Sequence, residues 1–224
     1  MSDTVWMSSV QSNAQIGMKQ GLREKFYGHD WTPAEFEIPL LPDEVFNAMD
    51  LSSKGYSLRR EQMPEAGAVW NEKAFSKVGN ILAIGGFFAV RGKLAEVLSR
   101  FDLGDGELYP LPVYQADLTS PYPDEFFLLN FGARKDTVLP ELCDDARKFV
   151  VRRATGKQVW KINQLQPDAD VVLSKDALRG ADLWIEDAVH NRIFMSDPLA
   201  QGIIEIGLKD VFRLQKCRLV GAGQ

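Results

Sequence analysis

The feature that most constrains the fold of this chain is the stretch 81–90, which is apolar except for Gly85-Gly86 at its centre. It is about half the ~20 residues that a membrane-spanning helix needs, so we expect it to be buried in a folded core. A glycine pair is typical of a tight turn or of close packing against a neighbour. Each apolar half is therefore a candidate buried strand; alternatively, the second half opens the helix that follows.

A helix is predicted directly after this stretch. Leu94, Val97, Leu98 and Phe101 recur at the spacing of one helical face. The glycine- and aspartate-rich residues 102–106 then end the helix.

The rest of the chain is mostly strand-like, with three further helices predicted. The first is a short helix over 43–49, with acidic residues in its first turn and Val45 and Met49 on one face. Candidate strands are residues 4–7, 107–117, 125–131, 159–162, 171–173, 182–186, 192–195 and 211–220. One helix is expected over 141–149. Another begins at Asp197, a suitable N-cap, with Pro198 in its first position. Strands and helices mix without regular alternation, so we predict an α+β fold: a mostly antiparallel sheet with a few helices packed on it.

The length of 224 residues fits a single domain, 1–224. Residues 76–220 carry the clear patterns and form the expected core. Residues 1–75 are less patterned and are an N-terminal extension that either folds onto the domain or forms a separate arm. No internal repeat is visible.

The net charge of −5, from 26 basic and 31 acidic residues, restricts the partners. It disfavours nucleic acid and anionic membranes, which are bound through excess Lys and Arg. It suits a basic partner protein. Residues 1–20 have neither the basic nor the apolar region of a secretory signal, so we expect a cytoplasmic protein.

No catalytic, cofactor or metal-binding motif is found. The two cysteines are far apart and the two histidines lie in no metal-ligand cluster. The best candidate for acid–base chemistry is a carboxylate–histidine pair between Asp187 and His190. The acidic doublets 144–145 and 186–187 and the basic residues within 147–157 are interpreted as solvated surface. Alternatively, the basic residues contact an anion or an acidic partner.

Four stretches, in this order, resemble a bacterial family. The first is Phe88-Ala89-Val90 with the helix 93–101. The second is Leu108-Tyr109-Pro110-Leu111-Pro112-Val113 followed by Phe127-Leu128-Leu129-Asn130, and the third is Gly180-Ala181-Asp182-Leu183-Trp184. The fourth is Arg192-Ile193-Phe194-Met195-Ser196-Asp197 running into Leu199, with Gly207-Leu208 after the helix. The family was first described as a domain of unknown function and later assigned to immunity proteins of polymorphic toxin systems. The resemblance covers about residues 87–214.

The resemblance implies a protein that is not an enzyme and that binds and blocks a toxin made by its own cell. It supplies no active-site residues. In the cytoplasm such a toxin would attack nucleic acid, nucleotides or translation. We expect an acidic contact surface, with either Asp102, Asp105 and Glu107 or Glu186 and Asp187 as contributors. The alternative is a small enzyme or ligand-binding domain that uses Asp187 and His190.

Overall fold

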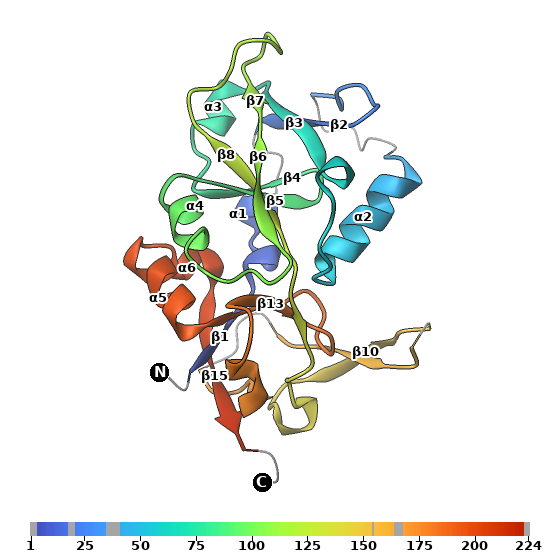
Figure 1. The fold of residues 1–224 in the computed structure, drawn as a ribbon, viewed down its shortest axis with the longest axis vertical. Helices are drawn as coiled ribbons and strands as arrows, with labels where there is room; N and C mark the ends of the chain where they lie inside the picture. Colours follow the sequence, from blue (N-terminus) through green and yellow to red (C-terminus); the bar gives the residue numbers. More distant parts are fainter. Residues whose placement is uncertain (1–3, 18–20, 35–40, 154, 164–167, 222–224) are drawn as a thin grey trace.

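The computed structural model describes residues 4–17, 21–34, 41–153, 155–163 and 168–221, which form fifteen strands and six α-helices. Most strand pairs are antiparallel, which confirms the α+β fold expected from the sequence. In the view of Figure 1 the strands fall into an upper and a lower half, with α4 and α5 on the same side of both.

The lower half is built on a six-stranded sheet. Its strands, in spatial order, are β12 (Val172–Ser174), β15 (Leu214–Val220), β1 (Val5–Ser8), β14 (Ile193–Ser196), β13 (Leu183–Glu186) and β9 (Arg134–Lys135). The two outer pairs are parallel and the others antiparallel. β1 lies between β14 and β15, so residues 5–8 belong to the core of this sheet and not to a separate arm.

The upper half holds two smaller sheets. The four-stranded, fully antiparallel sheet has the order β4 (Ile81–Ile84), β5 (Phe87–Arg91), β8 (Phe126–Asn130) and β6 (Glu107–Leu111). The three-stranded sheet has the order β2 (Leu22–Phe26), β3 (Pro64–Val69) and β7 (Val113–Tyr114). The strand interpretation of both halves of 81–90 is thus confirmed.

The six α-helices are short. They are α1 (Ala14–Gly17), α2 (Asp43–Ser53), α3 (Glu72–Phe75), α4 (Gly92–Leu98), α5 (Asp197–Glu205) and α6 (Lys209–Phe212). Within the described ranges, no helix has both the length and the apolar composition that crossing a membrane requires.

Both larger sheets contain the same arrangement of four strands and one helix. In the upper sheet β4 and β5 form a hairpin, β5 runs directly into α4, and β8 separates β5 from the later strand β6. In the lower sheet β13 and β14 form the corresponding hairpin, and β14 runs directly into α5. There β1 lies between β14 and β15, as β8 lies between β5 and β6 in the upper sheet. The repeat is not visible in the sequence, although both helices begin with a buried Leu-Ala pair, Leu94-Ala95 and Leu199-Ala200.

The main hydrophobic core lies where the two repeated units meet. Leu94 of α4 and Leu199 and Ile203 of α5 are fully buried in one cluster with side chains from both sheets. Burial of each such side chain contributes roughly 2 kcal/mol. The helices α4 and α5 pack against each other. A β-carbon built on Gly202 would lie 3.0 Å from Val97 Cγ1, so the glycine allows their close approach.

Two local predictions are wrong. Instead of a helix over 141–149, the chain forms a short 3₁₀ helix, Pro140–Leu142, and then the strand β10 (Arg147–Val151). Val150 and Val151 are β-branched and favour the strand. The N-cap of α5 is Ser196, whose hydroxyl accepts from Leu199 N, and not Asp197.

Candidate functional site

A two-stranded hairpin projects from the lower half of the molecule. β10 pairs antiparallel with β11 (Gln158–Lys161), with an irregularity in register between Lys148 and Val150. In Figure 1 the hairpin extends to the right, away from the lower sheet. In the described part of the chain no other strand pairs with β10, so its outer edge is open.

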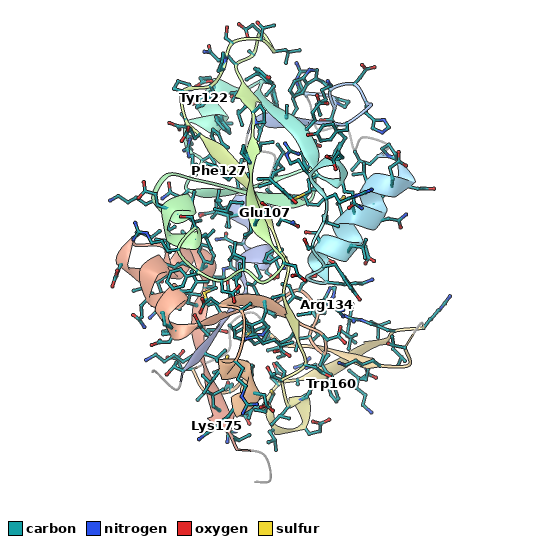
Figure 2. All side chains as sticks on the ribbon, in the orientation of Figure 1. Glu107, Tyr122, Phe127, Arg134, Trp160 and Lys175 are labelled. Atoms are coloured by element: carbon teal, nitrogen blue, oxygen red, sulfur yellow. The ribbon has the colours of Figure 1, made fainter. Side chains whose placement is uncertain are left out.

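The other strand of the hairpin is attached to the body of the protein. Trp160 N donates a hydrogen bond to Ala188 O at 2.8 Å, and His190 N donates to Trp160 O at 2.9 Å. Trp160 is labelled in Figure 2, in the lower half of the view. The hairpin is therefore held along β11, while β10 forms its free edge.

The free strand exposes three consecutive apolar side chains. Phe149 is 50%, Val150 47% and Val151 52% exposed to solvent. Half-exposed apolar residues on an open edge strand are a marker of an interaction surface. We call Phe149, Val150 and Val151 the apolar patch.

The hairpin is also strongly basic. Residues 147–161 contain six Lys or Arg and no Asp or Glu. The remaining chain then has 20 basic and 31 acidic residues, a net charge of −11. The hairpin is a positive element on an acidic body.

Asp187 anchors the base of the hairpin. Arg134 and Arg152 both donate to its Oδ1, and Lys157 Nζ donates to its Oδ2 at 2.9 Å. Lys157 also pairs with Asp136 at 2.6 Å. Burial by itself would raise the pKa of Asp187, but the hydrogen bonds and positive charges of these three partners outweigh it and lower the pKa to about 2. Asp187 is therefore an ionised structural anchor.

His190 lies beside the hairpin and is not paired with Asp187. Its imidazole stacks on Phe149, with ring centroids 4.5 Å apart and an interplanar angle of 29°. Burial lowers the pKa of His190, and the charges of Arg192 and Lys161 lower it further. No hydrogen bond or ion pair among the described residues joins His190 to Asp187. The structure does not bring the expected carboxylate–histidine pair together.

Glu186 is a buried structural group. Its carboxylate is fully buried and accepts from Thr137 N (2.7 Å), Thr137 Oγ1 (2.5 Å), Val138 N (3.2 Å) and Trp184 Nε1 (2.8 Å). The expectation that Glu186 and Asp187 contribute to an acidic contact surface is wrong, because Glu186 is inaccessible and Asp187 is bound by three cations. Trp184 is also fully buried and is no surface anchor.

The other acidic group expected at a contact surface stays accessible. Asp102, Asp105 and Glu107 are all exposed on the connection from α4 to β6 and on the first residue of β6. Asp102 Oδ1 accepts from Gly104 N at 2.7 Å, which holds the turn. Glu107 is labelled at the centre of Figure 2, in the upper half of the molecule and away from the hairpin.

Two pockets are relevant to ligand binding. A groove of about 360 Å³ lies between β10, the C-terminal end of α2 and the turn that holds His190. A pocket of about 820 Å³ at the start of α4 is lined by Arg91, Glu96, Asp124 and Glu125 among others. In the larger pocket Arg91 is already paired with Asp124 at 2.6 Å. The groove lies against the apolar patch, so we place the candidate site at the hairpin.

The sequence signal for this site is an apolar triplet, Phe149-Val150-Val151, between two basic pairs, Arg147-Lys148 and Arg152-Arg153. This signal does not single out the site, because basic residues in a surface segment are also typical of ordinary solvated surface. Comparisons with models of protein families and with curated proteins found no match to this chain.

Proposed function

We propose that this chain is a protein-binding protein that neutralises a cognate bacterial toxin in the cytoplasm by forming a complex with it. The observation that carries the proposal is the apolar patch on β10, in which three adjacent side chains are about half exposed. Leaving such side chains in water is unfavourable, and burying them against a partner contributes to the free energy of binding.

The chemistry around the patch supports binding over catalysis. The Asp187 carboxylate is bound by Arg134, Arg152 and Lys157, so it is not free to act as a base. His190 is stacked on Phe149, and no carboxylate among the described residues forms an ion pair with it. A stoichiometric inhibitor needs neither group to be reactive.

The assignment of the partner as a toxin comes from the resemblance over residues 87–214, which includes the whole hairpin. A specific complex of this kind buries roughly 1,600 Å² in total. The hairpin with its adjacent groove supplies the projecting part of such a surface, and inhibition follows if it covers the active site of the toxin or a surface that the toxin needs.

The test is a rescue experiment in a sensitive host. The neighbouring open reading frame is expressed with and without this chain, survivors are counted, and the complex is sought by co-purification. The proposal predicts that the neighbour kills alone and that this chain restores growth through a stable complex. A harmless neighbour, or rescue without a complex, would contradict it.

Matched variants connect the rescue to the hairpin. Phe149→Ser removes a side chain that is 50% exposed on β10, and the control Phe46→Ser removes one that is 51% exposed on α2. Phe149→Ser should weaken rescue while Phe46→Ser should not. Because Phe149→Ser also removes the stack on His190, Val151→Ser provides a second test that leaves the stack in place.

A further inference from the structure

We propose that the partner surface recognised by the hairpin is acidic, with carboxylates arranged around an apolar centre. This inference rests on the proposed function, because it names the chemistry of the partner at the same site. It reverses the expectation of a basic partner drawn from the net charge.

Local charge decides the encounter, because the Debye length at physiological salt is only about 8 Å. A partner that docks on β10 contacts the hairpin, whose residues 147–161 include six Lys or Arg and no Asp or Glu. Complementary charge at that position speeds association and excludes partners of the same sign. The net charge of the whole chain carries little weight at this distance.

Half of the basic residues of the hairpin remain available to a partner. Arg152 and Lys157 are bound by Asp187, and Arg147 is bound by Asp145 at 2.9 Å. The other three, Lys148, Arg153 and Lys161, are exposed and make no ion pair within the described residues. Lys148 and Arg153 flank the apolar patch along the chain, and Lys161 lies on β11 opposite Arg147. Carboxylates beside an apolar centre would match both features.

The arrangement of these charges is unfavourable in the free protein. Arg147 and Lys161 are directly opposite each other across the two strands. Like charges in this position destabilise a strand pair. An acidic partner would remove the repulsion on binding, so the hairpin is better suited to a complex than to the free state.

The hairpin of a second copy does not fit the same surface. Two hairpins in contact would bring twelve positively charged side chains together without an acidic residue from either hairpin. Charge repulsion and the irregular register at Phe149 both oppose pairing between two β10 edges.

The phosphates of a nucleic acid would pair with the basic residues of the hairpin but would not bury the apolar patch. Val150 and Val151 offer branched aliphatic surface, for which a phosphate backbone has no counterpart. An acidic protein surface with apolar side chains at its centre satisfies both features.

The test measures binding of labelled probes to the full chain by fluorescence anisotropy. The probes are a peptide of alternating glutamate and valine, one of glutamate and serine, one of lysine and valine, and a single-stranded oligonucleotide. We expect the glutamate–valine peptide to bind best, with weaker binding as salt rises from about 0.05 M to about 0.3 M. Tighter binding of either the lysine peptide or the oligonucleotide would overturn the inference.

Charge-reversal variants locate the binding. Lys148→Glu with Lys161→Glu should weaken binding of the glutamate–valine peptide at least about tenfold. The control pair, Lys93→Glu with Lys175→Glu, reverses two exposed charges outside the hairpin and should leave binding unchanged. If both double variants bind the glutamate–valine peptide equally well, the peptide does not bind at the hairpin.

The outcomes separate this inference from the proposed function. Hairpin-dependent binding of the acidic peptide, together with a harmless neighbouring gene product, supports the acidic-partner inference and rejects the toxin. A toxin complex that forms equally well with the Lys148→Glu, Lys161→Glu variant supports the function and rejects the inference.

Discussion

Arg147 and Lys161 occupy directly opposite positions in the β10–β11 hairpin, so two positive charges are adjacent across the strand pair. Asp145 offsets part of this repulsion by accepting from Arg147 Nε at 3.1 Å and Arg147 Nη2 at 2.9 Å. Lys161 has no such acidic partner among the described residues. The repulsion between Arg147 and Lys161 is therefore only partly compensated within the hairpin.

Reversing one of these charges should stabilise the free protein. Lys161→Glu creates an opposite-charge pair with Arg147, and we expect the free energy of unfolding to rise by about 0.5 kcal/mol. The control is Lys148→Glu, because Lys148 is opposite Trp160 and not a charged residue. Urea denaturation at low salt measures the difference between the two variants. If Lys161→Glu is no more stable than Lys148→Glu, the like-charge pair has no energetic cost.

Asp187 should make stability depend on pH in the acid range. Its pKa is about 2 in the folded protein and about 3.8 in the unfolded chain. A lowered pKa means that the stabilisation is fully present above about pH 4 and is lost as pH falls toward 2. Asp187→Asn should cost about 2 kcal/mol at pH 7.

The measurement is the free energy of unfolding of the wild type and of Asp187→Asn at pH 7, 4 and 3. The difference between the two proteins should narrow as pH falls below 4. Taking the difference cancels the contributions of other carboxyl groups. A gap that is the same at all three pH values would show that the charge of Asp187 does not anchor the hairpin.

Removal of the buried carboxylate of Glu186 should strongly destabilise the fold. Glu186→Ala leaves the backbone N–H groups of Thr137 and Val138 and the indole N–H of Trp184 without their acceptor. Each unsatisfied buried donor costs about 1–3 kcal/mol, so we expect a loss of about 4 kcal/mol. Glu186→Gln keeps one acceptor oxygen and should cost about half as much.

The control for the Glu186 variants is Glu107→Ala, which removes an exposed carboxylate and should change stability by less than about 0.5 kcal/mol. Thermal or urea unfolding measures all three. Similar losses for Glu186→Ala and Glu107→Ala would mean that the buried network contributes little.

The sequence predicted elements whose pattern is local. The hairpin β4–β5 follows from two apolar runs around a glycine pair, and α4 follows from the spacing of Leu94, Val97 and Leu98. β10 was missed because its apolar residues are exposed, so no alternation between core and solvent marks it as a strand. The strand conformation of β10 depends on its antiparallel pairing with β11.

Tertiary neighbours also explain why the site could not be derived from sequence. Glu186 and Asp187 are adjacent, yet one is buried against Thr137 and the other is bound by Arg134. Both partners are about fifty residues away in sequence. In the same way, β1 enters the lower sheet between strands that lie near the other end of the chain. Local patterns carry no information about such contacts.

His190 should report the charge of the hairpin through its pKa. Burial lowers the pKa of His190 below the ordinary value of 6.5, and Arg192 and Lys161 lower it further. Lys161→Gln removes one of these charges and should raise the pKa of His190, whereas Lys93→Gln on α4 should not. An NMR titration measures the change, and a His29→Asn variant assigns the remaining histidine signal.

The lowered pKa of His190 also determines how the stability of the folded protein changes with pH. Because the folded pKa is below the unfolded value, protonation disfavours the folded state, and stability is lost as pH falls from about 7 through 6.5 and then through the folded pKa. The wild type should therefore lose stability relative to His190→Gln over this range. A histidine that titrates at or above 6.5 would mean that the imidazole leaves the stack on Phe149 and faces solvent.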